Sequence, residues 1–344
     1  MKLIANKLSK VYLGHNELSF ISQTLNKNSY SCFFFVISHS VPKTYIKKII
    51  GSLNKEYILF YIKDGETNKN FSQFKKILNE LFKNKLDRES VLISIGGGSL
   101  NDLAGFCASI YLRGIDWMTI PTTPLSQMDA SMGGKTALNY QGKNTIGSFY
   151  LPHSIFIDTI FLKTVSKTIL KESFSEMIKM ALGFDQKLYS LLLKKDLSQT
   201  NNLHRVFTRC IQLKEKVVIQ DFREKKGLRQ KLNFGHTLGH VFEQSQKISH
   251  GKAVQEGLKT ALFLSKKLRC CTPKTYDKCI ELLNKFNTNG MTTFPPSQTI
   301  KKFLYKDKKR KKGEIDFIFL EKIGTLKVKK IQISELINYV SSYS

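Results

Sequence analysis

The chain has 344 residues, of which 41% are hydrophobic and 24% are charged, and this composition is typical of a folded globular protein. Its length exceeds the roughly 150 residues of an average domain, so we expect two domains. The longest apolar run, residues 32–37, is far shorter than the ~20 residues that a membrane span needs. No apolar signal core follows Met1. These features exclude a membrane protein and predict a cytoplasmic location.

The net charge is +28, from 55 Lys and Arg against 27 Asp and Glu. Such an excess fits nucleic acid, an anionic surface or an acidic substrate. The positive residues are mostly lysines spread along the chain, and no recognition-helix motif accompanies the densest cluster at 306–312. We therefore expect no nucleic-acid partner. The six cysteines show no CxxC spacing, which argues against a disulfide framework and against a cysteine-ligated zinc site.

In chain order, the first half alternates short apolar runs with segments of helical periodicity. The pattern predicts strands at 31–37, 56–62, 91–95, 117–120 and 155–158, and helices at 71–82 and 102–112. Strands that alternate with helices in this way indicate a mainly parallel sheet covered by helices.

After about residue 160, long helical periods dominate. We expect helices at 169–182, 203–219, 236–247, 253–268 and 276–286, then a strand pair at 315–320 and 324–328, and a closing helix near Ser334. The chain is thus predicted to form an α/β domain over 1–160 and a mainly α-helical domain over 161–344. The active site is expected in a cleft between them.

Two glycine-rich segments follow predicted strands. Gly96, Gly97 and Gly98 come directly after the strand 91–95, where consecutive glycines let the backbone approach a phosphate. The run lacks GxGxxG spacing, so a simple strand-to-helix turn is the alternative. Residues 133–136 resemble the end of a phosphate-binding loop for nucleoside triphosphates, but Asp129 stands where that motif needs its first glycine. We therefore expect no triphosphate site.

Histidines gather late in the chain. His236 and His240 are spaced i, i+4, so both project from one face of a helix, and His250 follows fourteen residues after His236. This is a common metal-binding pattern. Glu176 could supply a carboxylate, with Lys179 one turn further along its helix. A metal site is favoured, and the alternative is that one or more of these histidines caps a helix or packs in the interior without binding a metal.

Lys214 falls on the apolar face of the predicted helix 203–219. A lysine at such a position either extends its charged end to the surface or serves a binding site.

A series of short motifs runs in order through both halves. They are IGGGSLNDLAGF (95–106), YLRG (111–114), IPTT (120–123), QMD (127–129), GGKT (133–136), GKN (142–144), FSEMIK (174–179), GLR (227–229), NFGHTLGH (233–240) and HG (250–251). Together they resemble the 3-dehydroquinate synthase family, a branch of the sugar phosphate cyclases, over residues 64–324. Each motif alone is weak evidence of membership, but the ordered series of motifs is specific for this family.

The resemblance implies a phosphate-eliminating lyase of the shikimate pathway. Such enzymes convert 3-deoxy-D-arabino-heptulosonate 7-phosphate to 3-dehydroquinate and phosphate, as a step in aromatic amino acid biosynthesis. The implied sequence is oxidation of the C5 hydroxyl, phosphate elimination, carbonyl reduction, ring opening and aldol closure. It further implies a Rossmann-like N-terminal domain that binds NAD, a catalytic role for NAD, a zinc or cobalt ion, and a homodimer.

The resemblance also assigns roles to individual residues. The metal ligands are Glu176, His236 and His250, so His240 becomes a proton-transfer residue instead of a ligand. The other implied catalytic residues are Lys135, Lys179, Glu224 and Asn233. Substrate is bound by Arg113, Asp129, Lys135, Lys143, Asn144, Lys179, Lys214, Arg229, Asn233, His240, Lys308 and Lys309. Here Arg229 and Lys214 take the substrate carboxylate, and Arg113 reaches across the dimer. NAD is bound by Asp64, Gly65, Glu66, Lys69, Gly97, Gly98, Ser99, Leu100, Asn101, Asp102, Thr122, Thr123, Asp129, Lys135, Lys143, Phe161, Leu162, Lys163 and Thr164.

The chain departs from the family pattern at four places. Asn101 replaces a glycine, and Ser-His-Ser at 38–40 stands where an acidic contact to the adenosine ribose is usual. Lys252 replaces an acidic residue that follows His250 and Gly251, which removes a carboxylate from the surroundings of the metal ligands. One additional residue precedes Gly227, so Glu224 is the nearest counterpart of the family's acid there.

Four alternatives remain. Another sugar phosphate cyclase would share the cofactors, but its substrate lacks the carboxylate that Lys214, Arg229 and Asn233 suit. A metal-dependent alcohol or glycerol dehydrogenase would produce net NADH. A nucleic-acid binder would use the cluster 306–312, and a decayed enzyme would keep the fold without the activity.

Overall fold

A computed structural model describes residues 1–286, 293–306 and 313–341 of the chain. It divides into two compact units. The first comprises Met1–Ser166 with Lys214–Ile219, and the second comprises Lys167–Leu213 with Gln220–Ser344. Within the described ranges, no helix combines the length and the apolar character needed to cross a membrane.

The first unit is built on a seven-stranded sheet with the order β1-β2-β9-β6-β5-β3-β4. Its strands are β1 (Lys2–Ala5), β2 (Lys10–Gly14), β3 (Phe33–Ser38), β4 (Tyr57–Ile62), β5 (Val91–Gly96), β6 (Asp116–Pro121) and β9 (Ser154–Asp158). Every neighbouring pair is parallel except β1 and β2, which are antiparallel. The predicted parallel sheet is confirmed, and its five predicted strands correspond to β3, β4, β5, β6 and β9.

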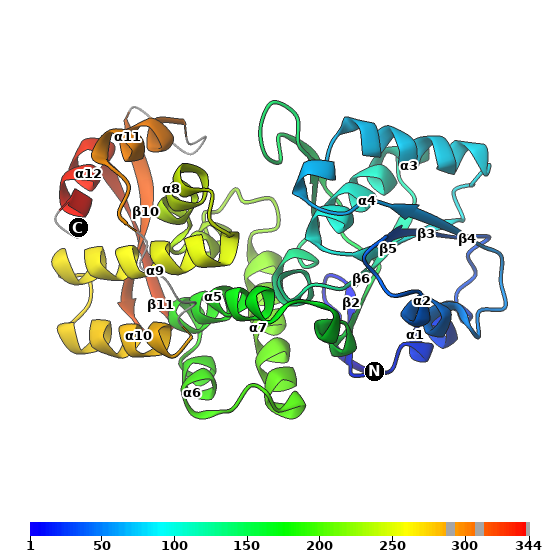
Figure 1. Cartoon of the computed structure of the whole chain (residues 1–344), viewed down its shortest axis with the longest axis horizontal. Helices are drawn as coiled ribbons and strands as arrows, with labels where there is room; N and C mark the ends of the chain where they lie inside the picture. Colours follow the sequence, from blue (N-terminus) through cyan, green and yellow to red (C-terminus); the bar gives the residue numbers. More distant parts are fainter. Residues whose placement is uncertain (287–292, 307–312, 342–344) are drawn as a thin grey trace. The chain divides into compact units, whose positions relative to one another are not determined.

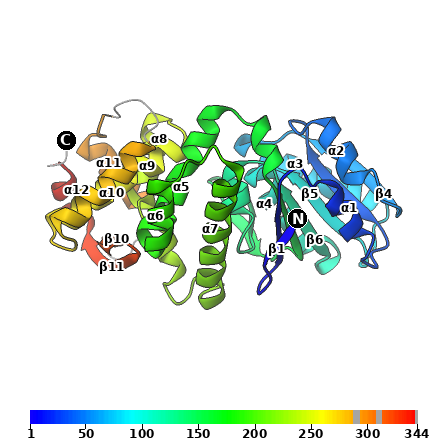
Figure 2. The same ribbon diagram turned by 90° about the horizontal axis from the view of Figure 1, so that it is seen from below.

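Helices cover both faces of this sheet (Figures 1 and 2). Alternate side chains of β3 show the two layers: Phe33 and Phe35 pack with α1 (Ser19–Leu25) and α2 (Lys43–Ile50). Phe34 packs on the opposite face with α3 (Phe71–Lys83) and α4 (Gly98–Ile110). Because both faces are buried, the strand reads as a continuous apolar run and not as an alternating one.

The direction of the chain through the sheet reverses next to β3. After the edge strand β4, the chain crosses back to form β5 on the other side of β3. Ligands of such sheets bind at the carboxyl ends of the strands where this reversal occurs. Here those ends are Ser38 and Gly96. The predicted start of α4 at 102 is wrong, because the helix begins at Gly98, the last glycine of the glycine-rich segment.

The second unit is mainly helical, as predicted. Its helices are α5 (Lys167–Phe184), α6 (Gln186–Lys194), α7 (Thr200–Gln220, shared with the first unit), α8 (His236–Gln246), α9 (His250–Lys267), α10 (Pro273–Lys285), α11 (Ser297–Lys306) and α12 (Ile333–Ser341). An antiparallel pair, β10 (Glu314–Lys322) and β11 (Thr325–Gln332), packs on α9 through a hydrogen bond from Leu320 N to Ser265 Oγ of 2.9 Å.

Close packing of α8 against α9 depends on glycine. A Cβ at Gly257 of α9 would lie 2.0 Å from the carbonyl oxygen of Gly235 and 2.6 Å from the amide nitrogen of Gly239. No side chain larger than hydrogen fits between these backbones without moving them. Because Gly235 directly precedes His236, this contact also fixes the start of α8.

Candidate active site

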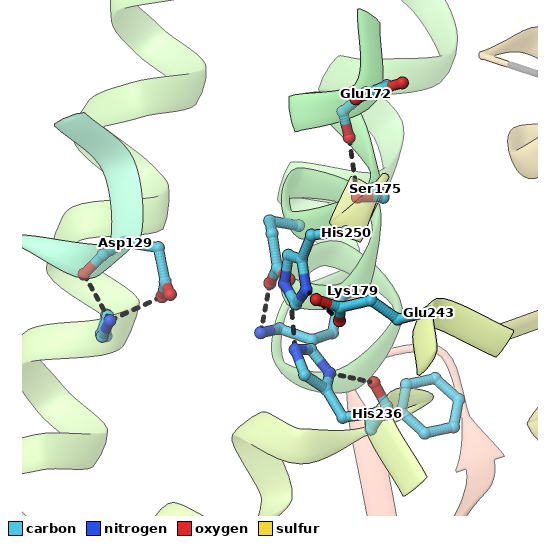
Figure 3. Close-up of polar contacts among 10 residues, drawn as sticks. Asp129, Glu172, Ser175, Lys179, His236, Glu243 and His250 are labelled. Atoms are coloured by element: carbon cyan, nitrogen blue, oxygen red, sulfur yellow. Dashed lines mark hydrogen bonds and ion pairs between the residues drawn. The ribbon is translucent and has the colours of Figure 1, made fainter. Parts of the chain in front are cut away.

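Three potential metal ligands of the second unit converge. Glu176 lies in α5, while His236 and His250 are the first residues of α8 and α9. Glu176 Oε1 lies 3.3 Å from His236 Nε2 and 3.6 Å from His250 Nε2. The ligand atoms of all three residues lie within 4.8 Å of one another. In Figure 3 the rings of His236 and His250 lie beside each other, with Lys179 next to them.

This arrangement fits a tetrahedral metal ion. Ligands with bonds of ~2.1 Å to zinc stand roughly 3.4 Å apart in a tetrahedron, close to the two separations found here. The outer nitrogens of both rings already face oxygens: His236 Nδ1 is 3.3 Å from the carbonyl of Phe234, and His250 Nδ1 is 2.9 Å from Glu243 Oε2. Both buried oxygens of Glu176 face groups of this cluster, Oε1 the two Nε2 atoms and Oε2 the Lys179 ammonium. The donor set is therefore turned inward and suited to a divalent cation.

Charge is balanced within this cluster. Glu176 and Lys179 are each 3% exposed and form an ion pair one helical turn apart. Burial alone would raise the pKa of Glu176, but Lys179 and then His236 hold it well below its usual range. Burial lowers the pKa of His236. Burial also opposes a charge on His250, yet its hydrogen bonds to Glu176 and Glu243 raise its pKa to about 9.

His240 lies one turn beyond His236, with 5.5 Å between the two ring centroids. Its side chain is exposed, and among the described residues it is not part of the group of converging ligand atoms. Glu243, which contacts His250, is absent from the residues predicted from the sequence. The spacing of 236, 240 and 243 on one helical face is the signal that could have found it.

A second cluster lies in the first unit, at the carboxyl end of β5. The amide of Gly97 donates to Asp64 Oδ2 at 3.0 Å, and a Cβ at Gly97 would lie 3.1 Å from that oxygen and 3.3 Å from Thr123 Cγ2. No side chain caps the start of α4, and its first turn has no acidic residue. The free amides of such a helix start favour a phosphate, so these predicted NAD residues fit a dinucleotide.

Lys69 links predicted cofactor and substrate residues. Its side chain is 2% exposed, and Nζ forms an ion pair with Asp102 and donates to Asn144 Oδ1 at 2.5 Å. Burial raises the pKa of Asp102 to about 6 in spite of this lysine.

Lys214 lies against Asp129. Asp129 belongs to a π-helical turn, Ser126–Ala130, and its Oδ1 is 2.6 Å from Lys214 Nζ, which also donates to the Asp129 carbonyl. Figure 3 shows both contacts at the labelled Asp129. Lys214 is 6% exposed, so its charged end is paired inside the protein and does not extend to solvent.

Arg229 begins a 3₁₀ turn, Arg229–Asn233, and is also buried. Its Nη1 donates to the carbonyl of Phe222 at 2.9 Å, and its Nε lies 3.5 Å from Glu224 Oε1. The structure thus brings the predicted residues Glu224 and Arg229 together.

The remaining predicted residues lie near strand ends or in loops. Ser99 Oγ donates to Glu66 Oε2 at 3.0 Å. Thr122 follows β6, Lys135 begins β7 (Lys135–Leu138), Lys143 lies between β7 and β8 (Ile146–Phe149), and residues 161–164 belong to the 3₁₀ turn Thr159–Thr164 after β9. Lys308 and Lys309 lie outside the described residues. His39 stacks on Tyr61 with 5.9 Å between ring centroids, beside a cavity of about 400 Å³.

Two family models match consecutive parts of the chain. Residues 59–172 match the 3-dehydroquinate synthase N-terminal model, and residues 173–310 match the 3-dehydroquinate synthase C-terminal model. The 3-dehydroquinate synthase of Campylobacter concisus (strain 13826) is 39% identical over 299 residues, which cover 86% of each chain. That of Helicobacter pylori (strain HPAG1) is 36% identical over 326 residues, covering 88% of this chain and 93% of the relative.

Solved structures share the fold at lower identity. A 2-deoxy-scyllo-inosose synthase complexed with carbaglucose-6-phosphate, NAD⁺ and Co²⁺ superposes with a TM-score of 0.86 at 22% identity, covering 98% of both chains. The 2-epi-5-epi-valiolone synthase of Streptomyces hygroscopicus subsp. jinggangensis 5008, with NAD⁺ and Zn²⁺ bound, gives 0.87 at 20% identity, covering 100% of this chain and 99% of the other.

Proposed function

The chain belongs to the 3-dehydroquinate synthase family, and we propose that Glu176, His236 and His250 hold the divalent metal on which its activity depends. The activity is that of the family: a lyase of the shikimate pathway that converts 3-deoxy-D-arabino-heptulosonate 7-phosphate to 3-dehydroquinate and phosphate. The observation that carries the metal assignment is the convergence of one carboxylate and two imidazole nitrogens on a buried point.

The residues around this point suit it to a cation. Lys179 keeps Glu176 ionised despite its burial, and oxygen acceptors on both Nδ1 atoms leave both Nε2 atoms facing Glu176. When bound, a zinc or cobalt ion supplies Lewis acidity toward substrate hydroxyl groups. Three protein ligands leave a coordination position for the substrate. We assign proton transfer to His240, which is exposed and lies next to His236.

We assign NAD to the carboxyl ends of β3, β5 and β6 in the first unit. The uncapped start of α4 binds the diphosphate through its amides, and Asp64 holds the Gly97 turn in place for it. When bound, NAD accepts a hydride from the substrate and returns it within the same turnover. Lys69 and Asp102, which form an ion pair, and the other NAD residues that the family resemblance implies keep their cofactor roles in this proposal.

The substrate is an acidic sugar phosphate, and we assign its carboxylate to Arg229. The planar guanidinium of arginine can bind a carboxylate through two parallel hydrogen bonds. Arg229 is held by the Phe222 carbonyl and by Glu224, and these contacts fix the orientation of its guanidinium. Lys135, Lys143, Asn144, Lys214 and Asn233 keep the substrate roles implied by the family resemblance.

We further propose a homodimer and a cytoplasmic location. Leu112, Arg113 and Gly114 have successive φ angles of 49°, 68° and 118°, a conformation that a non-glycine residue adopts only at a cost. Ile110, just before this turn, and Leu112 within it are both exposed apolar side chains. A strained, apolar and exposed segment of this kind is suited to an interface that directs Arg113 into the partner.

The experiment is an assay of phosphate release with purified protein, NAD and zinc. We expect release from 3-deoxy-D-arabino-heptulosonate 7-phosphate with equal 3-dehydroquinate and no net NADH. A sugar phosphate without a carboxylate serves as the comparison substrate. Turnover of that compound alone would identify a different cyclase, and net NADH from a polyol would identify a dehydrogenase. His250→Ala should lose both zinc and turnover, and normal zinc content in that variant would contradict the ligand assignment.

A further inference from the structure

The outer nitrogen of His250 faces a carboxylate from another helix. Glu243 Oε2, from the second half of α8, lies 2.9 Å from His250 Nδ1 at the start of α9. We propose that Glu243 is a positioning residue of this site, which orients the His250 ring and strengthens the binding of the metal by His250. This inference rests on the proposed metal site. This role falls to Glu243 in a chain that carries Lys252, not an acidic residue, two positions after His250.

The position of Glu243 follows from the helix on which it lies. His236, His240 and Glu243 are spaced i, i+4 and i+7, so they follow one another along one face of α8. Through Glu243, this face reaches His250, the first residue of α9. Figure 3 shows Glu243 beside the ring of His250. One helix thus supplies both a ligand and the carboxylate that positions the other histidine.

The two histidines are held unequally. His236 Nδ1 faces a neutral backbone carbonyl at 3.3 Å, whereas His250 Nδ1 faces a carboxylate at the shorter distance of 2.9 Å. A charge-assisted hydrogen bond is roughly twice as strong as a neutral one, and a carboxylate on Nδ1 increases the electron density available at Nε2. His250 also has the more exposed ring, 30% against 13%. It is therefore the ligand that depends more on an external group for its orientation.

A negative charge at this place also suits α9. The helix has no acidic residue in its first turn, and its N-cap residue, Ser249, makes no side-chain cap hydrogen bond. A carboxylate brought there by α8 interacts favourably with the positive end of the helix dipole. Glu243 consequently stabilises the metal-free protein as well, so an experiment must separate positioning of the ligand from a contribution to folding.

The test measures zinc affinity directly, by competition with a chromophoric chelator, in the wild type and in Glu243→Ala and Glu243→Gln. Loss of a group that positions a metal ligand costs about 10–100-fold in metal affinity. We expect that loss for alanine and a smaller one for glutamine, which keeps a hydrogen-bond acceptor without the charge. The matched control is Glu256→Gln in α9, because Glu256 is paired with Lys259 at 2.9 Å. Its zinc affinity should match that of the wild type.

A second readout distinguishes positioning from folding. The visible absorption of Co²⁺-loaded protein reports ligand geometry, and it should change in Glu243→Ala and be partly restored in Glu243→Gln. The thermal midpoints of the metal-free variants show which of them are folded. If Glu243→Ala does not fold, the zinc affinity and cobalt spectrum of Glu243→Gln test the inference. Zinc affinity within threefold of wild type in the folded variants, with an unchanged cobalt spectrum, would overturn the inference and leave the metal site standing. Failure of the wild type to bind zinc would instead overturn the metal site itself.

Discussion

Gly257→Ala tests whether the close contact of α8 and α9 is what assembles the metal ligands. The new Cβ would lie 2.0 Å from the Gly235 carbonyl oxygen, whereas contacts below 3.0 Å are essentially never found, so the two backbones must separate by at least 1.0 Å. His236 follows Gly235 directly and must move with it. Metal–ligand distances are tolerated only within about 0.2 Å, so a shift of this size removes His236 from effective coordination.

The expected result is a loss of both stability and zinc affinity. Overpacking of this kind costs about 1–3 kcal/mol of unfolding free energy, measured by urea titration of the metal-free protein. Zinc affinity, measured by chelator competition in the folded variant, should fall by more than tenfold. Gly183→Ala in α5 is the matched control, because the nearest atom to its Cβ would be Cδ1 of the movable Leu326 side chain, at 2.7 Å, and not a backbone atom. Wild-type stability and zinc affinity in Gly257→Ala would refute the role of this contact.

Three further predictions concern buried charges. Lys179→Met removes the lysine that is paired with the buried Glu176 carboxylate, so the metal-free protein should lose about 3–5 kcal/mol of unfolding free energy. Zinc should raise the thermal midpoint of this variant more than that of the wild type. Unchanged stability of the metal-free variant would contradict this prediction. Arg229→Ala should weaken substrate binding by roughly 2–5 kcal/mol, seen in steady-state kinetics, and an unaltered KM and kcat would rule out its carboxylate role. Because the folded-state pKa of Asp102, about 6, lies above the unfolded value, its ionisation destabilises the fold as pH rises from 4 to 6. Asp102→Asn should abolish this fall of at most about 3 kcal/mol in urea titrations without NAD, and an identical pH dependence in both proteins would disprove it.

The sequence predicts the elements whose burial is strong and local. The uninterrupted apolar residues of β3 and β5 and the periodic apolar face of α3 identify these elements almost to the residue. It does not predict β1 and β2, because these strands are short and exist through pairing, β1 with β2 and β2 with the distant β9. The start of α4 is misjudged for a related reason: Gly98 is a poor helix former, but at a helix start that faces a ligand its lack of a side chain is an advantage.

The metal site shows the limit of reasoning from spacing. The i, i+4 rule pairs His236 with His240, and their ring centroids are indeed only 5.5 Å apart. The centroids of His236 and His250 are 5.6 Å apart, so proximity of the rings does not separate the two possibilities. The position of Glu176 does, because its Oε1 is near the Nε2 atoms of His236 and His250. That position depends on how α5 packs, which spacing within one helix does not report.

The charges around the proposed metal site lead us to expect that a bound metal favours an anionic substrate. In the metal-free site, Lys179 and protonated His250 formally balance Glu176 and Glu243. A divalent ion can be ligated by His250 only after the proton on its Nε2 has left, because the same lone pair serves both. Replacing one proton by two positive charges makes the local sum +1. We therefore expect this group of side chains, formally neutral without the ion, to favour a sugar that carries a carboxylate and a phosphate once the ion is bound.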